Sequence, residues 1–126
     1  MADNDGLKRS QYMNTFVRCF QDDIVVDDII RFKEKELCAE KSAYPSKYSI
    51  EARIISESYT PARKQYFELE VIHSDGREPI EPGTIIKRRA STICRGEIAR
   101  RKWRNEWNRI ITLGAKQMKN VAEGCY

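Results

Sequence analysis

The residues with the clearest chemical potential form a basic segment from Lys87 to Arg104. This segment carries eight basic residues and one acidic residue, so its formal charge is 8 − 1 = +7. The whole chain of 126 residues is only +4, which leaves 4 − 7 = −3 for the rest. Such concentrated charge attracts phosphate groups and acidic protein surfaces. The basic residues are Lys87, Arg88, Arg89, Arg95, Arg100, Arg101, Lys102 and Arg104.

We expect the basic segment to contact the phosphate backbone of DNA or RNA. Its two triplets, at residues 87–89 and 100–102, are mildly unfavourable without counter-charges or an anionic partner. A nearby loop adds cations and a ring that can stack on a base: Tyr59, Arg63 and Lys64. Three alternatives remain open: pairing within the chain, for which the acidic residues at 22–28 are an obvious partner, binding of an acidic protein partner, and a solvated face. Either triplet also fits a nuclear import signal.

Catalysis has little support in the residue pattern. His73 is the only histidine, and no partner motif accompanies it. Glu68 and Glu70 lie on the polar side of a predicted strand, where solvated carboxylates are usual. The sequence contains no phosphate-binding glycine loop, zinc-hydrolase helix motif or nucleophile elbow. We therefore expect a non-enzymatic protein that uses no cofactor.

Four aspartates lie around residues 24–26, where carboxylates could bind a cation. Their spacing lacks the glycine turn of a calcium-binding loop. Aspartate is also a common turn residue, because its side chain bonds to nearby backbone. We interpret them as turn residues that flank a short strand at 24–26. They are Asp22, Asp23, Asp27 and Asp28.

The four cysteines are widely separated and include no Cys-x-x-Cys pair: Cys19, Cys38, Cys94 and Cys125. A zinc site would have to gather isolated residues from across the fold. The polar, acidic N-terminus lacks the basic and apolar regions of a secretory signal. We therefore expect reduced thiols in the nucleus or cytosol, and no metal site.

Composition and length predict one domain with a modest core. The chain is 40% hydrophobic and 33% charged, which is typical of a globular module with a large solvated surface. No apolar run approaches the roughly 18 residues of a membrane span. We expect a disordered lead at 1–10, a single β-rich domain with a C-terminal helix at 11–114, and a fraying tail at 115–126.

Strands are the clearest elements. Residues 48–55 and 65–71 both alternate apolar and polar side chains, and the polar, proline-containing loop between them predicts an antiparallel hairpin. Residues 29–32 and 84–90 also have strand character, and the second strand is expected to end near Ile93. Residues 11–20 fit either a short helix or a strand. A turn is predicted at Ser74–Gly76, because glycine adopts positive φ readily.

A helix is predicted from about Gly96. Apolar residues recur there at steps of three and four, which places Trp103 and Trp107 on one buried helical face, with Arg100, Arg101 and Arg104 pointing outward. The helix is expected to fray past Gly114. Together the elements indicate an α+β fold: a small antiparallel strongly bent sheet or partly open β-barrel with a C-terminal amphipathic helix.

The order of features from Ile29 to Leu113 resembles an uncharacterised plant domain. The most specific parts are the Glu-Ser-Tyr element at 57–59 and the basic-Trp element at 100–103. The resemblance also covers residues 29–32, 52–59, 64–71, 78–82 and 86–89. That domain accompanies SAP-type and CCCH zinc-finger modules in proteins expected in the nucleus. The resemblance therefore implies a nuclear location, with the cytoplasm as the alternative, and a DNA- or RNA-associated setting.

Overall fold

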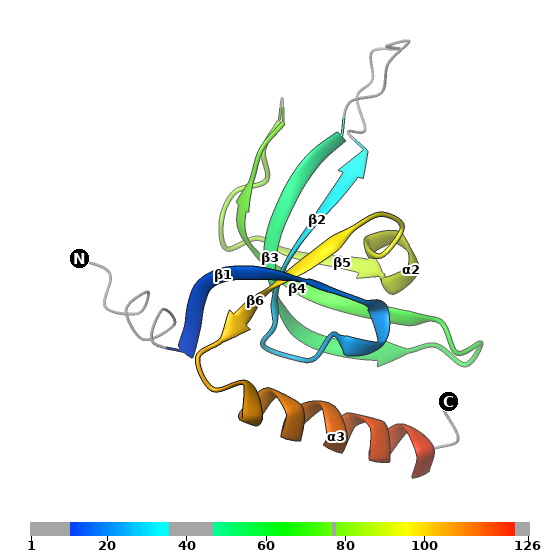
Figure 1. Ribbon diagram of the computed structural model, residues 1–126. Coiled ribbons are helices and arrows are strands. Elements are labelled where there is room, and N and C mark those ends of the chain that lie inside the picture. Colours follow the sequence, from blue (N-terminus) through cyan, green and yellow to red (C-terminus); the bar gives the residue numbers. More distant parts are fainter. Residues whose placement is uncertain (1–10, 36–46, 77, 123–126) are drawn as a thin grey trace.

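The structure is a computed structural model that describes residues 11–35, 47–76 and 78–122 (Figure 1). Within these residues the chain forms one six-stranded sheet and three helical segments. The strands are β1 (Tyr12–Cys19), β2 (Ile29–Lys35), β3 (Lys47–Tyr59), β4 (Gln65–Ser74), β5 (Ile85–Arg89) and β6 (Ile98–Trp103). The helical segments are η1 (Gln21–Asp23), α2 (Ala90–Ile93) and α3 (Glu106–Ala122).

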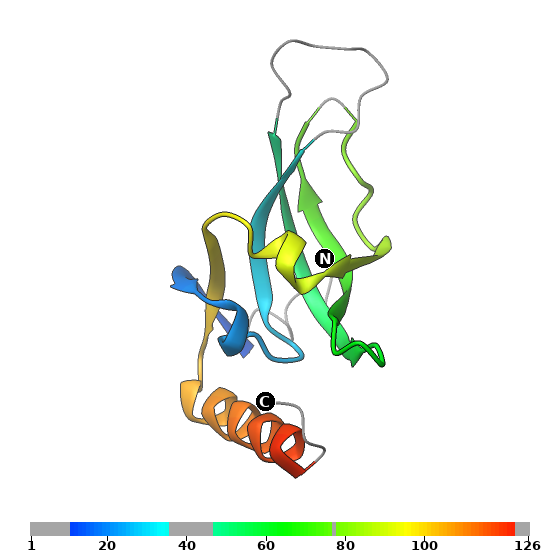
Figure 2. The same ribbon diagram turned by 90° about the vertical axis from the view of Figure 1, so that its right-hand side faces the viewer.

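The sheet has the strand order β1-β6-β2-β3-β4-β5, and each neighbouring pair is antiparallel. After β5 at one edge, the chain passes through α2 and returns near the other edge as β6, which lies between β1 and β2. The sheet is not closed, and α3 lies across one end of it in both views (Figures 1 and 2). The predicted α+β class, with an antiparallel sheet that is at most partly closed and a C-terminal helix, is therefore confirmed.

The predicted hairpin is also confirmed. β3 and β4 pair from Ile50↔Ser74 to Tyr59↔Gln65. The alternating apolar residues on β3 and β4 are almost completely buried: Ile50, Ala52, Ile54, Phe67, Leu69 and Val71. The alternation predicted the buried face because successive strand residues point to opposite sides. The turn after β4 contains Gly76 at φ 110°, as expected.

The core has two parts. The larger cluster joins the apolar face of β2, β3 and β4 to Ala90 and Ile93 of α2 and to Ile98 of β6. The smaller cluster contains Tyr12, Val25, Ile29 and Trp103, and Leu113 of α3 packs against it. Because neighbours Ile29 and Ile30 of β2 belong to different clusters, the two clusters lie on opposite faces of that strand.

The prediction of a helix from Gly96 is wrong. Residues 98–103 form β6, because their backbone pairs with β1 on one side and β2 on the other. Trp103 ends this strand and is 6% exposed, whereas Trp107 lies on α3 and is 66% exposed. The two tryptophans therefore share no buried helical face. α3 continues to Ala122, beyond the predicted end at Gly114.

The start of α3 has a local cause. The Asn105 side-chain oxygen accepts hydrogen bonds from the backbone N–H groups of Trp107 (3.1 Å) and Asn108 (3.4 Å). This is the N-cap interaction that satisfies donors left unpaired in the first helical turn. None of the helices in the described part of the chain is long and apolar enough to cross a membrane.

Two shorter predictions also need correction. The strand containing residues 84–90 ends at Arg89, and residues 90–93 form α2, whose Ala90 and Ile93 fill the larger core cluster. Residues 24–26 are not a strand. They lead into a turn in which the Asp28 N–H bonds to the Val25 carbonyl at 3.1 Å. Asp28 itself is completely buried, so it is more than a solvated turn residue.

Candidate nucleic-acid interface

A groove opens in the sheet where β2 and β6 part. β6 pairs with β2 only at Ile30↔Arg100 and Arg31↔Ala99, while β2 continues along β3 to Lys35. The next positions, Phe32 and Ile98, do not pair with each other, and both line a cavity of about 950 Å³. Such a volume lies within the range of ligand-binding clefts. We call this cavity the β2–β6 groove.

The lining of the groove is basic. Two carboxylates, Glu34 and Glu97, accompany five basic residues, which gives 5 − 2 = +3. Glu34 already has a partner, because the Arg88 guanidinium donates two hydrogen bonds to its carboxylate. Positive charge at a concave surface focuses the electrostatic potential and attracts anions. The basic residues are Arg18, Arg31, Lys33, Arg88 and Arg95.

Aromatic rings support two of these cations. The Arg31 guanidinium carbon lies 3.8 Å from the centroid of the Phe16 ring, and Arg101 lies 5.5 Å from the same ring. Arg18 of the groove lies 5.4 Å from the ring of Phe20, which is 58% exposed and is not part of the groove lining. Stacking orders a guanidinium while its N–H edge can still bind phosphate. Interleaved rings and cations are typical of single-stranded nucleic-acid grooves.

Two residues of the predicted basic segment line the groove. The Arg88 guanidinium contacts Glu34 at 2.7 and 3.1 Å. The hydrogen bond to Glu34 raises the pKa of Arg88, although burial opposes it. Arg88 is therefore largely neutralised by its partner. Arg95 is exposed, and within the described residues it makes no ion pair.

The triplet at residues 100–102 is partly occupied by structural contacts. Arg100 binds Glu106 with two hydrogen bonds at 3.0 and 2.8 Å. Arg101 pairs with Glu51 at 3.3 Å. Both arginines are half-buried on β6 rather than on an outward helical face. These two residues therefore have counter-charges within the chain, but the partners are Glu106 and Glu51 and not the acidic residues at 22–28.

The remaining predicted residues lie outside the groove. Lys87 and Arg89 are exposed on the edge strand β5, and β4, β3 and β2 lie between them and β6. The Lys87 ammonium lies 5.4 Å from the Tyr66 ring centroid. The loop candidates Tyr59, Arg63 and Lys64 lie at the tip of the β3–β4 hairpin. Lys102 and Arg104 lie at the end of β6 and just beyond it.

The structure therefore gathers Arg88 and Arg95 with three cations that the sequence argument did not select: Arg18, Arg31 and Lys33. They were missed because they are isolated in the sequence instead of forming a run. One signal was present. On β2, Arg31 and Lys33 alternate with the buried residues Ile30 and Phe32, which is the pattern of a strand with one basic face.

The described residues contain no group of three or more His, Cys, Asp or Glu side chains placed to hold a metal ion. Cys19 and Cys94 are free thiols, and burial raises the pKa of Cys19 to about 12 and that of Cys94 to about 11. The other two cysteines, Cys38 and Cys125, lie outside the described residues.

Comparison with known protein families shows a match over most of the sheet. A family model described as a domain of unknown function (DUF7699) matches residues 19–103, which is 85 of the 126 residues. The matched region contains β2, α2 and β6, which form much of the groove, while Phe16, Arg18 and α3 lie outside it. No curated protein and no solved structure matches the chain.

Proposed function

This chain belongs to the DUF7699 family, a domain of unknown function, and we propose that it binds the phosphate backbone of a nucleic acid through the β2–β6 groove. The observation that carries the proposal is the set of groove cations without carboxylate partners. Within the described residues, Arg31, Lys33 and Arg95 make no ion pair. Clustered cations repel one another, and an anionic ligand relieves that repulsion.

A polyanion fits this arrangement better than a single small anion. The cations come from β1, β2 and the segment after α2, around a groove of about 950 Å³. Such a spread suits successive phosphates along a strand. The exposed Phe20 ring beside Arg18 offers a platform for an unpaired base, as in other single-strand binders. Contacts to phosphate position a strand without reading its sequence, so the module has little base preference.

We further propose a non-enzymatic role in the nucleus, with the cytoplasm as the alternative. Support comes from the resemblance to a plant domain that accompanies SAP-type and CCCH zinc-finger modules. An acidic protein partner is the competing ligand for the same cations, and the experiment below separates the two.

The test is a titration of fluorescently labelled single- and double-stranded DNA and RNA at two salt concentrations. Binding that depends on phosphate contacts loses affinity steeply as salt rises, with a slope of roughly 0.7 to 0.9 per contact. The charge-removing variant Lys33→Gln/Arg95→Gln is expected to weaken binding and to reduce that slope by about two contacts.

The matched control is Arg63→Gln/Lys64→Gln, which removes the same charge from the exposed β3–β4 hairpin tip. It is expected to weaken binding less than the groove variant does. No binding to any nucleic acid at low salt would overturn the proposal, and so would equal losses in the two variants. Binding of a polyglutamate peptide through Lys33 and Arg95, with no nucleic-acid binding, would favour the acidic protein partner.

A further inference from the structure

One face of α3 is apolar and exposed. Four large residues on it are 53–76% exposed, and their spacing places them on one side of the helix together with Gly114. Monomeric proteins rarely leave such a contiguous apolar patch uncovered without a binding role. We call this set the α3 stripe: Trp107, Ile110, Ile111, Gly114 and Met118.

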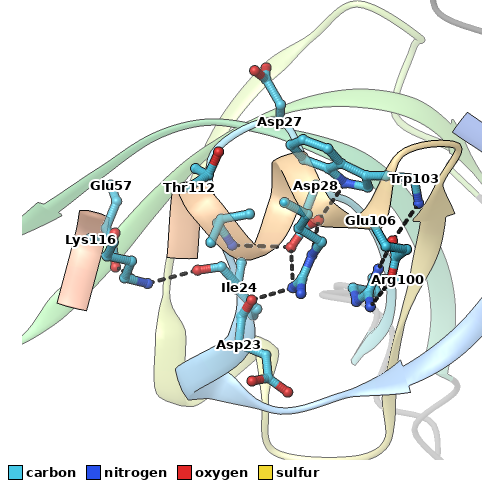
Figure 3. Close-up of polar contacts among 12 residues, drawn as sticks. Asp23, Ile24, Asp27, Asp28, Glu57, Arg100, Trp103, Glu106, Thr112 and Lys116 are labelled. Carbon is cyan, nitrogen blue, oxygen red and sulfur yellow. Dashed lines mark hydrogen bonds and ion pairs between the residues drawn. The ribbon is translucent and has the colours of Figure 1, made fainter. Parts of the chain in front are cut away.

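The opposite face of α3 attaches the helix to the rest of the fold, largely through polar contacts (Figure 3). Arg109 bonds to Asp28 at 2.8 and 2.9 Å. Lys116 donates to the Ile24 carbonyl at 2.7 Å, and it pairs with Glu57 at 2.9 Å. These contacts hold the helix in one rotation about its axis. The α3 stripe therefore cannot turn inward without breaking them.

No contact among the described residues requires a glycine at position 114. A methyl group added at its Cα would meet no atom within 4 Å, and the residue lies inside a regular helix. Glycine in a helix interior is less favourable than alanine. A side-chain-free position does, however, allow another helix to approach closely. The glycine therefore points to a helical partner on this face.

We propose that the α3 stripe pairs with the α3 stripe of a second copy of this chain, with the two helices antiparallel. Reversing one helix so that Trp107 faces Met118 also places Ile111 against Gly114, because 107 + 118 = 111 + 114 = 225. Trp107 then meets the flexible side chain of Met118, and Ile111 meets the position without a side chain at Gly114, which is how facing layers interdigitate. The contact is two-fold symmetric, as in most homodimers.

The charges agree with a second copy. On α3, within residues 106–118, the charged side chains are Glu106, Arg109 and Lys116, and each makes an ion pair within the chain. The α3 stripe is therefore uncharged, so two positively charged chains can meet there without local repulsion. A nucleic acid, an acidic protein or an anionic membrane would find no cation on it. Because one helix pair is smaller than a standard interface of roughly 800 Å² per partner, we expect a weak dimer.

This inference is independent of the proposed function. None of the residues that line the β2–β6 groove lies on α3, so a dimer keeps two open grooves. Two grooves on one dimer would raise the affinity for a long strand through avidity. Failure of either proposal leaves the other intact.

The test is sedimentation equilibrium of the full chain from low to high micromolar concentration. Wild type is expected to shift from monomer towards dimer. Ile111→Glu puts a charge in the stripe and should keep the chain monomeric throughout. The control Thr112→Glu adds the same charge on α3 outside the stripe and should leave dimerisation unchanged. Circular dichroism checks that each variant is folded.

A second variant, Gly114→Ala, should change monomer stability and dimer affinity in opposite directions. It should raise the stability of the monomer to urea, because alanine favours the helix, and it should weaken dimerisation several-fold, because the added methyl group separates the helices. A wild type that stays monomeric at every concentration overturns the inference. So does an Ile111→Glu variant that dimerises like wild type, or a Gly114→Ala variant that dimerises more tightly.

Discussion

The Asp28 carboxylate and the Arg109 guanidinium form a buried two-point ion pair, with N···O distances of 2.9 and 2.8 Å. The exposed fractions of the two side chains are 0% and 6%. The same carboxylate accepts the indole N–H of Trp103 at 2.8 Å and the backbone N–H of Val25 at 3.0 Å. One side chain between η1 and β2 thus connects α3 to the end of β6.

We predict that Arg109→Gln strongly destabilises the fold, because it leaves the Asp28 carboxylate buried without its cation. Removing one partner of a buried pair costs roughly 3–5 kcal/mol. Urea unfolding followed by circular dichroism measures the loss. Arg95→Gln is the matched control, because this exposed arginine makes no ion pair within the described residues, and its effect should stay within about 0.5 kcal/mol. Equal losses in the two variants would contradict the assigned role of Asp28–Arg109.

The two tryptophans provide a second matched pair. Trp103→Phe removes the hydrogen bond to Asp28 and part of the edge-to-face contact with Tyr12, whose ring centroid lies 6.2 Å away. We expect a loss of about 1–3 kcal/mol in the free energy of unfolding. Trp107→Phe should change it little at concentrations where the chain is monomeric. Acrylamide should quench the fluorescence that remains in Trp103→Phe more than that in Trp107→Phe.

Cys19 should be inert to alkylation in the folded protein. Its side chain is 2% exposed, and burial raises the pKa of its thiol to about 12. The reactive thiolate is therefore scarce at neutral pH and also inaccessible. Treatment with iodoacetamide followed by peptide mapping should leave Cys19 unmodified in buffer and modified in urea. Equal modification rates under the two conditions would show that the thiol is not buried.

Glu106 should make stability depend on acidic pH. Its hydrogen bond from Arg100, and a second from the Trp103 backbone N–H, lower the pKa of its carboxyl below the ordinary 4.5, although burial opposes them. Because the folded-state pKa is the lower one, this stabilisation is present above about pH 4.5 and is lost as the pH falls through the folded-state value.

The measurement is the free energy of unfolding of wild type and of Glu106→Gln at a series of pH values. The advantage of wild type over the variant should shrink as the pH falls from about 7 to about 3. A difference that stays constant over this range would mean that the Glu106 charge does not contribute.

Phe20 should contribute to binding of single strands. It is 58% exposed beside Arg18, so Phe20→Ala should leave the fold intact. A base stacked on an aromatic ring contributes about 1–3 kcal/mol, and affinity for single-stranded nucleic acid should fall accordingly. Double-stranded DNA, whose bases are already stacked, should bind as before. Ile72→Ala, at a 39% exposed residue on β4, is the control, and an equal loss there would exclude stacking.

Much of the sheet could be predicted because its strands carry their pattern locally. Residues 48–55 and 65–71 alternate between buried and exposed side chains, and a turn-forming loop joins them. Each residue therefore already indicates which face it occupies. The same alternation on β2 marked Arg31 and Lys33 as a basic face, although only runs of charge were selected as candidates.

The segment at residues 98–103 could not be assigned by the same reasoning. Ala99, Trp103 and Trp107 recur every four residues, which fits a helix, while Ile98 to Trp103 also fits a strand. The segment forms a strand and not a helix because its backbone N–H and C=O groups pair with β1 on one side and β2 on the other. Asn105 then caps the helix, which begins at Glu106. The sequence contained this capping signal, but the apolar periodicity obscured it.

The sequence by itself determined how much positive charge the chain carries and which of its strands have one apolar face. Only the tertiary structure decided what each charge does. Arg88, Arg100 and Arg101 meet carboxylates that lie from six to 54 residues away in the chain, whereas Arg31 and Lys33 make no ion pair with any residue that the structure describes. Coulombic pairing depends on distances of a few ångströms, and chain folding sets such distances between residues that are remote in sequence.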